Sequence, residues 1–274
     1  MTVEKVYSPR SPLRDPRGFL SSAHADLARS VRLGGRLAAA NLRATYRRSW
    51  LGYLSLILPA VAATGVALVL SQQRVLTIRA LPIPYAAFVI SGTVLWQLFV
   101  EVVNAPLQRL RAYRHVISRS AIPHESFILA GVVEALANSA VRLTLAVPLL
   151  IWLGAGPGPG LLWLPLIIFG LCSLALCVGV LAAPFGLLYE DVSRLLLLLT
   201  SLWLFISPVL YPISPESLLR LNPVSPLIDG ARAALTNQAV PFSSLAAGAG
   251  AFAGLWLVWL LYRLATPHVV ARLG

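Results

Sequence analysis

The segment LLWLPLIIFGLCSLALCVGVLAAPFGLL, residues 161–188, decides the class of fold. It contains no charged residue and exceeds the roughly 20 apolar residues that a helix needs to cross a bilayer. Cys172 and Cys177 lie inside it on different helical faces, so we expect buried free thiols rather than a disulfide or a metal pair.

Six apolar runs along the chain are candidates for membrane-spanning helices. Only 12% of the 274 residues are charged, about half the share of a typical soluble domain, and the mean hydropathy is +0.78. This composition predicts an all-α integral membrane protein whose six-span domain covers residues 50–264. The predicted spans are about 50–72, 84–106, 125–153, 161–188, 194–213 and 243–263.

The basic residues predict the orientation of these spans. With the amino terminus inside, seventeen of the 22 Lys and Arg residues fall in cytoplasmic segments, Arg142 lies within a span, and only Arg74, Arg79, Arg220 and Arg232 fall outside. Because cytoplasmic loops are enriched in Lys and Arg, both termini, including residues 265–274, are predicted to be cytoplasmic. The same distribution accounts for the net charge of +12 without a nucleic-acid partner.

Residues 27–49 are predicted to form an amphipathic helix on the inner membrane surface, after a flexible tail of residues 1–26. At 100° per residue the arginines fall within one arc and apolar side chains lie opposite, which is typical of an interfacial helix. The alternative is a plain basic flank that happens to be helical. The arginines of the arc are Arg29, Arg32, Arg36, Arg43 and Arg47.

Two other segments interrupt the pattern of simple spans and loops. Ser214-Pro215 and Ser225-Pro226 each combine an N-cap residue with a proline, which predicts two short re-entrant or outer helices between spans five and six. In the third span, Glu134, Asn138 and Arg142 share one face. They indicate either a pathway or gate contact, or an internal Glu–Arg pair bridged by the asparagine.

The chain lacks the residues for nucleotide hydrolysis. Lys5 is the only lysine, so a phosphate-binding loop with its lysine cannot be built within the spans. No metal-binding motif is present, and the spans carry few polar residues. The sequence therefore predicts neither an enzyme nor a bound cofactor.

Five blocks in order carry a resemblance to the permease subunits of type-2 ABC exporters of lipid-linked polysaccharide, such as O-antigen, teichoic acid or galactan. Together they cover about residues 42–264. Two positions depart from the family pattern: Glu190-Asp191 replaces an Arg-Asp pair, with the cation displaced to Arg194, and Arg142 stands where a small or apolar residue is expected. The blocks are LRATYRRSWLGYL (42–54), PYAAFVISGTVLWQLF (84–99), IPHE (122–125), YEDV (189–192) with SPVLYP (207–212), and LNPVSPLIDGAR (221–232).

The resemblance implies a pore made by two copies of this chain in a bacterial plasma membrane. Two copies of a separate ATPase, which bind the ATP and Mg²⁺, would drive a lipid-linked glycan through it. The resemblance also implies a coupling helix in the loop between spans two and three. Placed on one helix, residues 110–121 have a basic stripe, Arg111, His115 and Arg119, opposite Leu110, Tyr113, Ile117 and Ala121.

The resemblance and this helical phasing together give five groups of candidate residues. The aromatic candidates for glycan contact could equally form an interfacial belt or ordinary core, as we expect of Trp152, Trp163 and Trp256. The groups are, for ATPase coupling, Arg111, Tyr113, Arg114, His115, Arg119, Pro123 and Glu125; for the interfacial helix, Arg43, Arg47 and Arg48; for the second inner loop, Glu190, Asp191 and Arg194; for glycan contact, Tyr85, Phe88, Trp96, Phe99, Trp203, Phe205 and Tyr211; and for the outer gate, Asn222, Pro223, Asp229 and Arg232.

Two other functions fit the same composition. A type-2 exporter of a drug or small lipid would have the same architecture and also an ATPase partner. The other is a structural membrane protein or a stand-alone secondary carrier. A carrier would work without nucleotide and would show internal repeats, which the sequence lacks.

Overall fold

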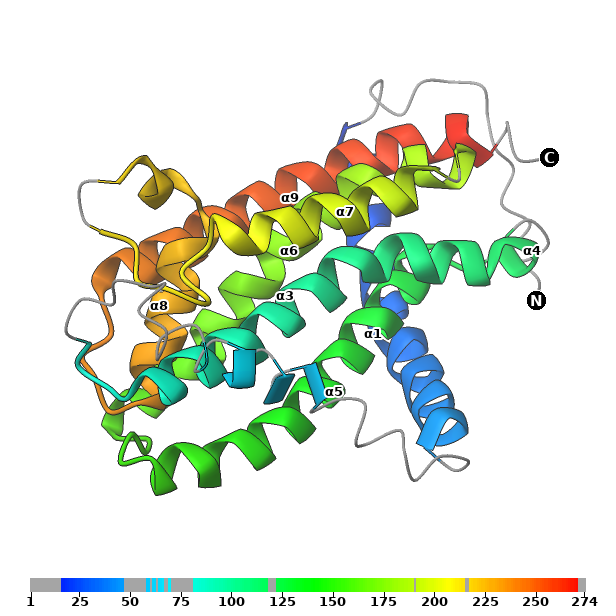
Figure 1. The fold of residues 1–274 in the computed structure, drawn as a ribbon. Helices are drawn as coiled ribbons and strands as arrows, with labels where there is room; N and C mark the ends of the chain where they lie inside the picture. The colour runs from blue at the N-terminus through cyan, green and yellow to red at the C-terminus, as the bar shows by residue number, and fades with distance from the viewer. Residues whose placement is uncertain are drawn as a thin grey trace.

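The computed structural model describes residues 16–46, 58–59, 61–62, 64–66, 69, 81–117, 122–189, 191–214 and 217–270. All regular structure in these residues is helical (Figure 1). The helices are α1 (Pro16–Tyr46), α3 (Tyr85–Ala112), α4 (Arg114–Ile117), α5 (Glu125–Trp152), η2 (Pro159–Trp163), α6 (Leu164–Leu188), α7 (Asp191–Phe205), η3 (Leu218–Leu221), α8 (Val224–Leu235) and α9 (Phe242–Val270).

Four helices in the described part of the chain are long and apolar enough to cross a membrane. They are α3, α5, the continuous helical segment Pro159–Leu188, and Phe242–Ala265 of α9. These helices match the second, third, fourth and sixth predicted spans, and they support an all-helical integral membrane protein. Most of the first predicted span, residues 50–72, lies outside the described residues.

The fifth predicted span, residues 194–213, is not one continuous helix. α7 has 15 residues and so a length of about 22 Å, short of the roughly 30 Å hydrocarbon core. Pro208 explains where it ends, because the residue before a proline is disfavoured in the helical conformation and proline supplies no amide hydrogen. The chain continues through turns over residues 206–209.

The helices form an elongated bundle with two distinct ends (Figure 1). α6 packs against both α3 and α9, and α3 packs in turn against α5. The core between them includes Phe99, Leu171 and Leu227, all nearly inaccessible. We call the end that carries α4, the α6–α7 connection and the end of α9 the α4 end, and the opposite one the α8 end.

α1 begins at Pro16, so residues 16–26 are helical and the predicted flexible tail is wrong there. It packs across α5 through a buried stripe of small or short side chains: Ala23, Asp26, Ser30, Gly34 and Ala38. A Cβ at Gly34 would lie 2.9 Å from the Ser126 carbonyl oxygen and 3.0 Å from Leu129 Cβ, so glycine allows this close crossing. The opposite face, with Arg29, Arg32, Arg36 and Arg43, is exposed as the periodicity predicts.

The two short helices between α7 and α9 are present, but they start at other residues than predicted. The Ser217 side chain accepts a hydrogen bond from the Leu219 amide and caps η3. Asn222 Oδ1 accepts from the Val224 amide, 3.1 Å away, at the start of α8. Ser225, predicted to be a cap, instead lies inside α8.

Candidate functional site

The α4 end does not contain the single helix predicted over residues 110–121. α3 continues to Ala112, the chain turns at Tyr113, and α4 covers only Arg114–Ile117. Arg111 therefore belongs to the last turn of α3. Arg119 lies outside the described residues, as do Arg47, Arg48 and Glu190.

The Arg111 guanidinium is directed into the protein rather than away from it. Its Nε donates to the Gly186 carbonyl at 2.8 Å, Nη2 donates to the Tyr189 carbonyl at 2.8 Å, and Nη1 donates to Ser193 Oγ. Arg111 thus joins the end of α3 to the α6–α7 connection. The predicted basic stripe is divided, because His115 lies on α4, where it is exposed together with Arg114.

Two other residues predicted for ATPase contact also face inward. The Tyr113 ring stacks on Phe127 with centroids 4.8 Å apart, and its hydroxyl donates to Asn41 Oδ1 of α1. Glu125, at the start of α5, is buried and accepts from Arg263 Nε at 2.8 Å. Arg263 of α9 also binds Asp26 of α1 at 2.6 Å. Pro123, just before α5, is partly buried.

A second polar cluster attaches α1 to the α3–α5 pair. Glu134 of α5 accepts from Arg109 of α3 through one oxygen and from Asn41 Nδ2, 2.8 Å away, through the other. The polar stripe of the third predicted span indicates Glu134, but Arg109 and Asn41 were not predicted as its partners. Glu134 itself indicated that such partners exist, since a carboxylate at membrane depth requires a cationic or hydrogen-bond donor partner.

Removing the Asn41 amide is expected to loosen α1. Asn41→Ala deletes the hydrogen bonds to Glu134 and Tyr113, so trypsin should cleave faster at the exposed arginines of α1. The expected increase in the cleavage rate is about tenfold, because a tenfold change corresponds to the free energy of one hydrogen bond to a charged group. Cleavage is followed by gel electrophoresis of the purified protein. Thr45→Ala, an exposed change on the same helix, is the control and should leave the rate unchanged; equal rates for the two variants would contradict the cluster's role.

The polar face of the third predicted span pairs with α3 rather than forming the internal Glu134–Arg142 pair considered above. Arg142 donates to Glu101 Oε1, and Asn138 Nδ2 lies 3.5 Å from Glu101 Oε2. The Arg142 side chain is only 6% exposed, so the contact is covered by protein as a charge in a membrane requires. Two ion pairs, Arg109–Glu134 and Glu101–Arg142, thus link α3 to α5 at different depths.

The α6–α7 connection, predicted to be the second inner loop, is solvent-accessible where the structure describes it. Arg194 Nη1 lies 3.6 Å from Asp191 Oδ1, and the two side chains are 83% and 92% exposed. Such a surface pair contributes little to stability. Both groups therefore stay accessible to a partner protein.

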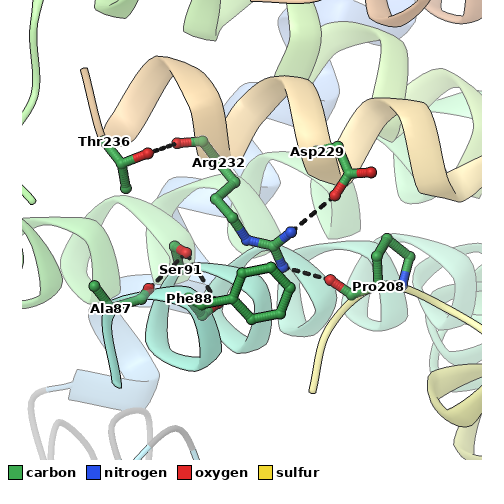
Figure 2. A network of polar contacts seen from close by, with 7 residues as sticks. All are labelled: Ala87, Phe88, Ser91, Pro208, Asp229, Arg232 and Thr236. Atoms are coloured by element: carbon green, nitrogen blue, oxygen red, sulfur yellow. Dashed lines mark hydrogen bonds and ion pairs between the residues drawn. The ribbon is translucent and has the colours of Figure 1, made fainter. Parts of the chain in front are cut away.

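At the α8 end, the buried side chain of Arg232 connects three segments (Figure 2). Its Nη1 donates to Asp229 at 2.8 Å, Nη2 donates to the Pro208 carbonyl, and the guanidinium carbon lies 3.7 Å from the centroid of the Phe88 ring. Burial lowers the pKa of Arg232 to about 10, against the opposing effect of Asp229, so the group stays charged at neutral pH. Arg232 therefore holds α8, the segment 207–212 and α3 together.

Gly92 and Asn222 complete this cluster. A Cβ at Gly92 would lie 2.6 Å from Arg232 Nη2 and 2.8 Å from the Val209 carbonyl, so only glycine leaves room for the guanidinium. Asn222 accepts from Trp203 Nε1 at 3.0 Å and donates to Ser207 Oγ at 2.9 Å. Three of the predicted gate residues, Asn222, Asp229 and Arg232, thus meet in this region, while Pro223 is exposed at the start of α8.

The predicted aromatic candidates do not form one exposed surface within this chain. Phe88, Trp96 and Phe99 are buried, and Trp203 packs edge-on against Phe99 with centroids 5.4 Å apart. The hydroxyls of Tyr85 and Tyr211 donate to the carbonyls of Leu210 and Phe205. Phe205 is the member of the group that stays largely exposed, at 57%.

Cys172 and Cys177 are free thiols, as predicted, although Cys177 is only partly buried. In the part of the chain that the structure describes, no group of three or more His, Cys, Asp and Glu side chains is placed to hold a metal ion. The described residues thus form a helical membrane unit with an exposed basic tip at one end and a tightly connected set of short helices at the other.

The family model described as "ABC-2 type transporter" matches residues 35–236, which is most of the chain and includes helices α3 to α8 with the clusters around Glu134 and Arg232. The chain belongs to the ABC-2 type transporter family. It is thus the membrane subunit, or permease, of an ABC transporter, in agreement with the absence of a lysine-containing phosphate loop.

Among relatives, the chain is 26% identical over 217 residues to the O-antigen export system permease protein RfbA of Myxococcus xanthus. The match covers 75% of this ABC-2 permease and 80% of the relative.

Proposed function

We propose that this permease forms the pore of an ATP-driven exporter that moves a lipid-linked polysaccharide across the bacterial plasma membrane to its outer side. Two copies of the chain would form the pore, and two copies of a separate ATPase would power it. The observation that carries the substrate class is the similarity to an O-antigen export permease over three quarters of the chain. Both termini and the α4 end face the cytoplasm in this proposal, in accord with the distribution of arginines.

The substrate is tested by depleting the protein in its native cell and analysing lipid-linked glycans. Accumulation of one undecaprenyl- or polyprenyl-linked glycan on the inner side of the membrane is the expected result. Unchanged glycans together with increased sensitivity to drugs, or an altered small-lipid composition, would favour the alternative exporter. A galactan, a teichoic acid and an O-antigen are distinguished by the sugar composition of the accumulated lipid.

The ATPase is proposed to bind the exposed tip formed by α4. Arg114, His115 and Val116 are accessible there, at the turn between two long helices that ion pairs hold together. Arginine makes directional contacts to carboxylates and carbonyls, so a cleft with acidic or carbonyl groups on the ATPase suits this tip. Arg194 and Asp191 lie at the neighbouring inner loop and extend the same surface.

Reversing the charge of this tip is expected to weaken assembly. Arg114→Glu should lower co-purification of the ATPase by about tenfold, because one hydrogen bond between charged groups contributes roughly 1.5–3 kcal/mol. Arg220→Glu, an equal charge change on exposed η3 at the opposite end, serves as the matched control. Full retention of the ATPase by Arg114→Glu, with the permease correctly folded, would refute this docking site.

A further inference from the structure

The contacts of Arg111 occur at a place where two helices meet. Gly186 is in the last turn of α6, Tyr189 is the residue directly after α6, and Ser193 is in the first turn of α7. Carbonyls in the last turn of a helix have no partner within the helix and favour a positive charge. The three hydrogen bonds of Arg111 therefore fix the α6–α7 junction to the end of α3, next to the turn that leads into α4.

α7 is attached at its two ends and only weakly held between them. Leu196 and Thr200 are its buried residues, whereas Leu195, Leu198 and Leu202 are largely exposed. At the far end, Trp203 donates to Asn222, which also donates to Ser207 just beyond the helix. Because a helix is stiff along its axis, movement of one end of α7 displaces the other.

The far end of α7 leads directly to the cluster around Arg232. Ser207 is followed by Pro208, whose carbonyl accepts from Arg232, and Tyr85 of α3 donates to the Leu210 carbonyl at 2.8 Å. A continuous set of contacts thus runs from Arg111 through α7 to α8, from the α4 end to the α8 end (Figure 1).

We propose that Arg111 is a positioning residue that transmits movement of the exposed tip formed by α4 to α7. α7 then transmits this movement to the segment 207–212 and α8. This inference rests on the proposed function, in which a partner ATPase moves the tip. Arg111 would not touch the ATPase or the substrate. Its role would be to convert movement at the exposed α4 into movement of the short helices at the opposite end.

The inference is tested in the complex of permease and ATPase reconstituted in lipid, with Arg111→Ala. Three readouts are compared: bound ATPase, glycan exported per ATP hydrolysed, and the ATP-induced emission change of a dye on Leu218→Cys in η3, an exposed position. The dye is used with Cys172 and Cys177 replaced by alanine. We expect normal ATPase binding, loss of the dye response, and export per ATP lower by about tenfold, since three hydrogen bonds are lost together.

Two further variants separate positioning from folding. Arg111→Lys keeps the charge but not the planar fork of donors, so it should give an intermediate dye response. Gln108→Ala, an exposed change in the same last turns of α3, should behave like the wild type. Wild-type export per ATP in Arg111→Ala, or equal loss of ATPase binding and folding in Arg111→Ala and Arg111→Lys, would overturn the inference.

Failure of the proposed function gives a different pattern. If the wild-type complex shows the ATP-induced dye response but exports no glycan, the proposed substrate is wrong. The dye response of Arg111→Ala then still tests whether Arg111 transmits the movement. If the wild-type chain binds no ATPase and shows no response to ATP, both the proposed function and the inference are refuted.

Discussion

Arg232→Ala is expected to abolish export and to destabilise the α8 end more than any other single truncation there. The change leaves the Pro208 carbonyl without its donor, removes the partner of Asp229, and opens a cavity beside Phe88. Breaking a buried ion pair costs about 3–5 kcal/mol, and the lower value applies because the Asp229 side chain is 43% exposed. The thermal midpoint of the purified protein and export by cells measure the two effects.

Gly92→Ala tests the same cluster without removing any polar group. The added methyl group would lie 2.6 Å from Arg232 Nη2, so the guanidinium must move off the Pro208 carbonyl. Overpacking of this kind costs about 1–3 kcal/mol. Gly250→Ala on α9, where the added Cβ would have no atom within 4 Å, is the matched control. If Gly92→Ala and Gly250→Ala were equally stable and active, Arg232 could not be what holds α8 to α3.

The sequence indicates which blocks lie at this end but not how they meet. Residues 84–99, 207–212 and 221–232 were recognised as separate blocks, and hydropathy put them near one side of the membrane. That Phe88 contacts a guanidinium and Trp96 lies in the core follows only from packing between helices, which periodicity cannot specify for a helix buried on most sides. For the same reason, the aromatic candidates could not be divided into core and exposed residues beforehand.

At the α4 end, the location of the charged loop was predictable and the direction of its side chains was not. The stripe of Arg111, His115 and Arg119 assumed one uninterrupted helix, and the turn at Tyr113 places Arg111 and His115 on different helices. The inward direction of Arg111 depends on the unpaired carbonyls of a helix 75 residues further along the chain. Glu125 likewise depends on Arg263, and no local pattern reports such a distant partner.

Arg142→Glu is expected to reduce the yield of folded permease by tenfold or more. It would place two carboxylates together within the span, where the structure has the Glu101–Arg142 pair. A charged residue without a partner near the centre of a membrane helix costs about 2.5–3.5 kcal/mol, which corresponds to roughly a hundredfold in a folding equilibrium. Size-exclusion chromatography of a fluorescent fusion in mild detergent measures the fraction of correctly folded protein.

The exchange Glu101→Arg with Arg142→Glu decides whether the pair itself is responsible. Since it restores opposite charges between α3 and α5, the double variant should recover most of the yield lost by Arg142→Glu. The same exchange at Asp191 and Arg194, which are 3.6 Å apart and largely exposed, should leave the folded yield unchanged. A double variant that folds no better than Arg142→Glu would show that Arg142 is needed for other contacts. Recovery of folding without recovery of export would instead show that the polarity of the pair matters when the α3–α5 unit moves.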